Sequence, residues 1–152
     1  MTSKRKRRTF ALHAALAAIL AYSAFAMAQT DKRPTIEDMH RLLETAAREA
    51  NKQLANTRID DFTTLKLVTY DRGVPVFTYH YTSNILQATG QKSIPQAARK
   101  AMIDYHRTKT CATKYALLMR VFGLQVAHRF EDRETGLEII AVTIQGTDCP
   151  RS

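Results

Sequence analysis

Four histidines are the residues of this chain best suited to metal or acid–base chemistry, and their spacing follows no known signature. They are His40, His80, His106 and His128, the four of the chain's five histidines that follow residue 28. If the strands that carry His80 and His128 share one sheet, their side chains could approach each other. A metal site would need a third ligand such as His106, and the spacings typical of zinc sites are absent. We therefore expect structural histidines, no bound metal and no cofactor.

Motifs of the common catalytic families are also missing. The sequence has no G-x-S-x-G, no P-loop and no dinucleotide-binding fingerprint. Asp60 and Asp61 could act as paired carboxylates. Two acidic residues at the end of a linker more often cap a turn. We assign no catalytic residue and do not expect an enzyme.

Lysine and arginine gather in residues 92–120, the stretch most suggestive of binding. It holds seven of them against a single acid, Asp104. Arg107 follows Arg99 by eight residues and Lys100 by seven, so the three share one face of a helix. Such a face could bind an acidic protein, an anionic lipid or lipopolysaccharide, and an ordinary solvated helix would look the same. We call these three residues the basic face and take them as candidate partner-binding residues.

A second candidate binding surface is aromatic. Phe77, Tyr79 and Tyr81 alternate along one predicted strand and share a face of it. If helices cover the opposite face of the sheet, these rings are exposed and mark a binding site. If helices cover the same face, the rings pack in the core.

The start of the chain resembles an export signal. A basic run at 4–8 precedes an apolar stretch at 10–26, and Ala26-Met27-Ala28 supplies the small residues that a signal peptidase requires. We predict a signal peptide over residues 1–28 and a single periplasmic domain over 29–152, in a Gram-negative bacterium. An uncleaved anchor stays open, because the apolar stretch is near the minimum length for a span. Twin-arginine export, suggested by Arg7-Arg8, also stays open.

The overall charge is less informative than it looks. The chain has 23 Lys and Arg against 14 Asp and Glu, a formal net charge of +9, and five of the cations lie in the basic run at 4–8. The predicted mature domain is therefore only mildly basic. We expect no nucleic-acid partner, and contact with a membrane only through the signal peptide.

Both cysteines, Cys111 and Cys149, lie in the predicted mature domain. In an oxidising compartment, two thiols in one small domain usually pair. A redox or nucleophilic thiol is the alternative, but the chain has no C-x-x-C motif. We predict one disulfide.

Hydrophobic spacing predicts the order helix, hairpin, helix, hairpin. A helix over 35–54 opens with a capping box of Thr35 and Asp38. A second helix opens with a capping box of Ser93 and Gln96, bends near 108–110 and ends at Gly123. Its predicted inner stripe is Ile94, Ala97, Ala98, Ala101, Met102 and Tyr105. The predicted strands are 64–70, 74–82, 124–131 and 137–145, with a loop over 83–92. We expect an α+β fold of αββαββ order, in which two helices pack on one face of a four-stranded antiparallel sheet.

One ordered set of residues resembles a loose group of small exported bacterial proteins of uncharacterised function. It spans Ile59 to Cys149 and reads I-D-x2-T-x-L, then Y-x-Y, then C, G, D-x3-G and C. The members are Ile59, Asp60, Thr63, Leu65, Val68, Tyr79, Tyr81, Cys111, Gly123, Phe130, Asp132, Gly136 and Cys149. The resemblance implies an exported αββαββ domain with one disulfide, and it carries no catalytic residue.

These observations favour a non-catalytic periplasmic domain that binds another envelope or exported protein, an acidic one if the basic face is used. An inhibitor, an immunity factor or an accessory of envelope or secretion machinery would fit. Two alternatives stay open: a small-ligand or metal-binding protein that uses His80 and His128, and a small hydrolase.

We predict that the protein recovered from the periplasm of a Gram-negative host begins at Gln29, because cleavage should follow Ala28. Intact-mass spectrometry of the periplasmic fraction should give the mass of residues 29–152. Recovery of the complete chain in the membrane fraction would instead establish an uncleaved anchor.

Overall fold

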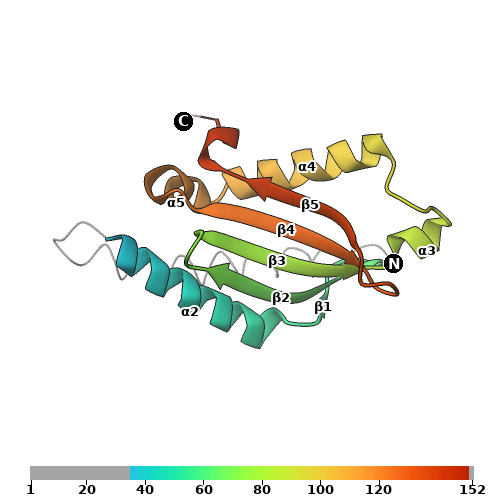
Figure 1. Ribbon diagram of the computed structural model, residues 1–152, viewed down its shortest axis with the longest axis horizontal. Coiled ribbons are helices and arrows are strands. Elements are labelled where there is room, and N and C mark those ends of the chain that lie inside the picture. Colours follow the sequence, from blue (N-terminus) through green and yellow to red (C-terminus); the bar gives the residue numbers. More distant parts are fainter. Residues whose placement is uncertain (1–34, 151–152) are drawn as a thin grey trace, which may run out of the picture.

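A five-stranded sheet forms the centre of the computed structural model, which describes residues 35–150 (Figure 1). The signal peptide predicted for 1–28 and its cleavage point lie outside these residues. The strands are β1 (Thr57–Arg58), β2 (Thr63–Asp71), β3 (Val76–Ser83), β4 (Gln125–Asp132) and β5 (Glu138–Ile144). They lie in the sheet in their order along the chain.

The sheet is mixed, which corrects our prediction of four antiparallel strands. Both hairpins are antiparallel as expected, but β3 and β4 pair in parallel, and the short strand β1 adds to β2. Three helices, α3 (Ile85–Thr89), α4 (Gln96–Cys111) and α5 (Tyr115–Phe122), connect β3 to β4. A connection of this length carries the chain back to the end of the sheet where β3 began, which parallel pairing requires. The α+β class is confirmed.

One face of the sheet forms the core, and the helices α2 (Ile36–Leu54) and α5 pack on it. From the sheet it contains Leu65, Val68, Phe77, Tyr79, Val126, His128, Phe130, Ile140, Val142 and Ile144. The helices add Met39, Leu43, Ala46, Ala47, Ala50, Leu54, Tyr115, Ala116 and Met119. Phe77 is fully buried and Tyr79 is 7% exposed, so these aromatic rings fill the core rather than a surface.

Helix α4 differs from its prediction. Of the predicted inner stripe, Ile94 and Met102 do pack against the core, but Ala97, Ala98, Ala101 and Tyr105 are exposed. His106 and Thr110, which were not predicted to face inward, meet His128 on the sheet. The expected capping box at Ser93 does not form, because the helix begins at Gln96 with no side-chain cap. Alanine fits a buried or an exposed position almost equally well, so the alanines of the stripe did not identify the inner side of the helix.

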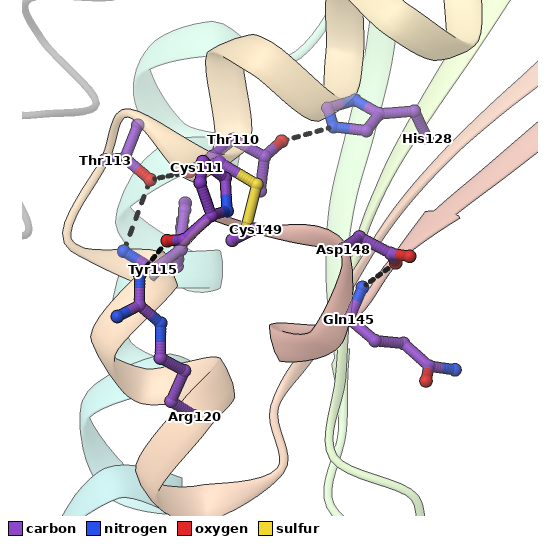
Figure 2. Close-up of a disulfide and its surroundings, with 10 residues drawn as sticks. Thr110, Cys111, Thr113, Tyr115, Arg120, His128, Gln145, Asp148 and Cys149 are labelled. Carbon is purple, nitrogen blue, oxygen red and sulfur yellow. Dashed lines mark hydrogen bonds between the residues drawn. A yellow bond between two sulfur atoms is a disulfide. The ribbon is translucent and has the colours of Figure 1, made fainter. Parts of the chain in front are cut away.

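A glycine ends helix α5, and a disulfide holds the end of helix α4. Gly123 ends α5 in the left-handed conformation, with φ 68°, as its sequence position predicted. At the junction of α4 and α5, Cys111 forms a disulfide with Cys149, their Cα atoms being 5.3 Å apart (Figure 2). The predicted pairing is therefore present, and it ties the end of α4 to the segment that follows β5.

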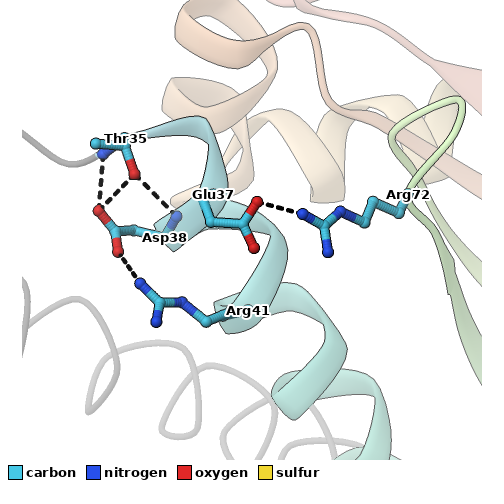
Figure 3. Close-up of polar contacts among 5 residues, drawn as sticks. All are labelled: Thr35, Glu37, Asp38, Arg41 and Arg72. Carbon is cyan, nitrogen blue, oxygen red and sulfur yellow. Dashed lines mark hydrogen bonds and ion pairs between the residues drawn. The ribbon is translucent and has the colours of Figure 1, made fainter.

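The capping box predicted for the first helix is confirmed. The Thr35 hydroxyl accepts the Asp38 backbone N–H at 3.2 Å, and the Asp38 carboxylate accepts the Thr35 N–H at 3.0 Å (Figure 3). The backbone N–H and the hydroxyl of Thr35, then Arg41, lower the pKa of Asp38 to about 2. Glu37, in the first turn of α2, forms an ion pair with Arg72 in the turn between β2 and β3. The start of α2 is thereby fastened to the first hairpin.

None of the helices within residues 35–150 has both the length and the hydropathy needed to cross a bilayer.

We predict that the double variant Cys111→Ser/Cys149→Ser loses about 2–4 kcal/mol of unfolding free energy, because the disulfide restricts a long loop in the unfolded chain. The two cysteines are 38 residues apart. Urea unfolding followed by circular dichroism measures the loss. Thiol titration of the denatured, unreduced protein should find essentially no free sulfhydryl, and finding two would contradict the pairing.

Candidate functional site

A stack of aromatic and histidine rings lies where β3 pairs with β4. The parallel register places Tyr79 beside His128 and Tyr81 beside Phe130. The rings of Tyr79 and His128 are stacked with centroids 5.1 Å apart, and those of Tyr81 and Phe130 are stacked at 4.5 Å. Had β3 and β4 paired in another register, these side chains would not be neighbours.

His128 is the most heavily engaged polar side chain of the stack. Its Nδ1 is 3.2 Å from the Tyr81 hydroxyl, and its Nε2 is 3.4 Å from the Thr110 hydroxyl. Burial, and then the charge of His106, lower the pKa of His128 well below its usual value. The ring centroids of His128 and of His106 on α4 are 4.1 Å apart. The neutral His128 ring therefore anchors α4 to the sheet, and both of its nitrogens already have hydroxyl partners.

The tyrosine hydroxyls of the same region are also satisfied internally. Tyr79 and Tyr115 share a hydrogen bond of 3.0 Å in the core. Burial raises the pKa of Tyr79, Tyr81 and Tyr115, so all three stay protonated at neutral pH. Groups fixed in one protonation state and bonded to each other are suited to packing rather than to proton transfer.

His80 and His128 do not form a site. They project from opposite faces of the sheet, and the His80 Nε2 is 2.9 Å from the Thr69 hydroxyl. His40 is elsewhere, on α2, where its Nδ1 meets the Tyr70 hydroxyl at 2.5 Å. Among residues 35–150, no group of three or more histidine, cysteine or acidic side chains is arranged to hold a metal ion.

The acidic pair shapes a turn, as its position suggested. The Asp60 carboxylate accepts the backbone N–H groups of Phe62 and Thr63 at 2.7 Å each. The Asp61 carboxylate forms an ion pair with the Arg58 guanidinium, with Oδ1 and Nη2 3.4 Å apart. These contacts define the link between β1 and β2.

The basic face is on the surface, and part of its charge is neutralised. Arg99, Lys100 and Arg107 are all exposed. Lys100 and Arg107 both bind the Asp104 carboxylate, each at 2.7 Å, and the hydrogen bond from Lys100 is the main cause that lowers the pKa of Asp104. No side chain within residues 35–150 pairs with Arg99. The face therefore keeps a surplus of positive charge.

A pocket at the other end of the crossover was not predicted from the sequence. Its volume is about 570 Å³, and it is lined by Met119, Arg120, Gly123, Leu124, Gln125, Gln145, Gly146, Thr147 and Cys149. The short helix η1 (Gly146–Asp148) packs so tightly on α5 that a Cβ at Gly146 would lie 3.1 Å from the Met119 carbonyl group. A glycine after the last strand was the only signal of this approach.

Comparisons with known proteins support the fold. No family model matches the chain, and no curated protein matches it in sequence. A solved structure from Pseudomonas aeruginosa, named as a candidate secreted protein, shares 16% identity and superposes with a TM-score of 0.58 over 78% of this chain and 100% of its own. A pilotin from the type 2 secretion system of Vibrio vulnificus also shares 16% identity, with a TM-score of 0.52 over 74% of this chain and 96% of its own. At this identity the likeness extends to the fold alone.

The buried His128 predicts how stability depends on pH. Because the pKa of His128 is lowered in the folded state, this residue binds a proton below about pH 6.5 in the unfolded chain but stays neutral in the folded chain. The contribution of His128 to the free energy of unfolding is fully present above this pH. Below it, the free energy of unfolding should fall by about 1.4 kcal/mol per pH unit until the folded-state pKa of His128 is reached. Urea unfolding between pH 7.5 and 4.5 measures the slope, and His128→Phe should flatten it.

His80 is the matched control for this measurement. Burial lowers its pKa as well, but it is only partly buried, so His80→Gln should keep most of the slope. The lowered pKa values of Asp38, Asp104 and Asp132 act below this range. Equal slopes in the parent protein and His128→Phe would contradict the anchoring role of the neutral ring.

Proposed function

We propose that this chain is a non-catalytic protein-interaction domain of the bacterial envelope, and that it serves as an accessory of a secretion system. The basic face on α4 is the binding surface, and Arg99, Lys100 and Arg107 are the residues that meet the partner. An acidic protein surface is the chemistry that suits them.

The observation that carries this proposal is the unused surface of α4. The helix has 16 residues, of which only Thr110 is buried. Helices of globular proteins usually bury a broad apolar stripe against their own core. A long helix that is anchored at one end by His106 and a disulfide, and exposed along the rest, is available to a partner.

The solved structures support the secretion role. A protein named as a candidate secreted protein and a pilotin of a type 2 secretion system have this fold. An exported location is also what the start of the chain predicts. The buried histidine and tyrosine groups, already bonded to one another, support a non-catalytic role.

Charge reversal tests the proposal. The triple variant Arg99→Glu/Lys100→Glu/Arg107→Glu should remain folded by circular dichroism, because all three side chains are exposed. We expect its affinity for the envelope partner to fall roughly tenfold or more at low salt, because opposite charges accelerate encounter and like charges oppose it. The difference should shrink as salt screens charges beyond about 8 Å.

The matched control reverses three exposed cations elsewhere, Arg48→Glu/Lys52→Glu/Lys66→Glu, which changes the net charge equally. Both variants and the parent protein are used to capture partners from envelope extract, with mass spectrometry to identify them. A secretion component retained by the parent and the control, and lost by the basic-face variant, is the expected result. Equal capture by all three would contradict a role for the basic face.

A further inference from the structure

The two edges of the sheet differ in whether other parts of the chain hydrogen-bond to their backbone. At the β2 edge, β1 pairs with Thr64 and Leu65. Beyond β1, the Asn51 side chain on α2 donates to the Val68 carbonyl at 2.7 Å and accepts the Val68 N–H at 2.6 Å. An amide side chain thus takes the place of a neighbouring strand, and this edge is closed.

The β5 edge has no such cover. Strand β5 pairs with β4 only, and within residues 35–150 no loop or side-chain hydrogen bond reaches the backbone of residues 138–144. Its seven residues, EIIAVTI, include no proline and no lysine, and the β-bulge that interrupts its pairing lies at its start, before Ile140. The strand is rich in the β-branched residues that favour pairing.

The register identifies the backbone groups that face outward. Gln125 donates its N–H to Pro75, so the odd-numbered residues of β4 bond to β3 and the even-numbered ones to β5. The pairs Val126–Ile144, His128–Val142 and Phe130–Ile140 are therefore the hydrogen-bonded ones. Ala141 and Thr143 consequently point their N–H and C=O groups away from the sheet, whereas Ile139 lies in a β-bulge opposite Phe130 and Glu131 and does not follow this alternation.

Helix α4 lies beside this open edge, at the opposite side of the sheet from α2 (Figure 1). This helix carries Arg99, Lys100, Arg107 and Lys109 against the single acid Asp104, so the element beside β5 is cationic. A second copy of this chain, pairing β5 with β5, would bring two such cationic helices together. Charge therefore favours an acidic partner over self-association.

We propose that the β5 edge accepts an extended acidic segment of a partner protein as a sixth strand. The inference rests on the proposed interaction function and assigns its site. Ala141 and Thr143 supply the backbone hydrogen bonds. Side chains of the added strand that face α4 are acidic, and those on the opposite face are β-branched, next to Ile139 and Ala141. Backbone pairing supplies affinity, and the charge on α4 selects the segment.

The substitution Ala141→Pro tests binding at the β5 edge without disturbing the fold. The Ala141 N–H points away from β4, so Ala141→Pro removes one outward donor and blocks the edge without breaking a bond to β4. Ala141→Val, which keeps the N–H, is the matched control. Circular dichroism and urea unfolding show whether both variants remain folded.

The probe is an acetylated seven-residue peptide of alternating glutamate and valine, matched to the length of β5. Bound to the exported protein labelled with ¹⁵N, it should shift the amide signals of Ala141 and Thr143. Its affinity by calorimetry should fall roughly tenfold or more in Ala141→Pro and stay near the parent value in Ala141→Val. Two control peptides, one of alternating lysine and valine and one of glutamate and valine with an N-methylated backbone, should bind the parent protein no more tightly than the glutamate–valine peptide binds Ala141→Pro.

Three results would overturn the inference. The first is the absence of shifts at these amides. The second is equal affinity for the parent protein and a folded Ala141→Pro. The third is sedimentation of the parent as a dimer that Ala141→Pro separates, which would make a second copy the occupant. In each case, partner capture by the charge-reversed α4 variant still tests the proposed function separately.

Discussion

The parallel pairing of β3 and β4 is the interaction on which the rest of the structure depends. It stacks Tyr79 on His128 and Tyr81 on Phe130 at the centre of the core. It also sets which backbone groups of β4 bond to β5, and so which groups of β5 face outward. The three-helix crossover that makes this pairing possible brings α4 and its cations to the β5 side of the sheet.

The crossover is held at one end only. Thr110 and His106 meet the neutral His128 ring, and Cys111 is bonded to Cys149 one residue further on. These contacts fall in the last turns of α4, whereas residues 96–101 are exposed and Met102 alone packs against the core between them. A helix fixed in this way keeps its charged surface in a constant place without using that surface for folding, which suits a binding element better than a flexible loop would.

The polar groups of the core serve the fold. His128, Tyr79 and Tyr115 are buried, their hydrogen bonds are satisfied by neighbours, and their pKa values are displaced toward the neutral forms. Because an unpaired buried polar group is costly, this network favours one arrangement of α4 and α5 over alternatives. The proposed binding surfaces, namely the basic face and the open β5 edge, lie outside this network.

The sequence alone determined what depends on neighbouring residues. The cap at Thr35 and Asp38, the end of α5 at Gly123, both hairpins and the pairing of two cysteines follow from local chemistry and from there being only two thiols. The exposure of Arg99, Lys100 and Arg107 followed from helical spacing. The inner side of α4 followed only in part: Met102 packs inward as predicted, but the alanines fit either side and the anchoring His106 looks no different from a surface histidine.

Only the tertiary structure decided how the two hairpins meet. Periodicity shows which side chains share a strand face but not which strands are neighbours, so the parallel joint, the separation of His80 from His128 and the burial of Phe77 and Tyr79 could not be read from the chain. The same limit applies to the edges: Asn51 closes one and nothing within residues 35–150 closes the other. Long-range pairing has this freedom because strand edges present the same backbone groups whatever the sequence, and the packing of helices selects among the arrangements.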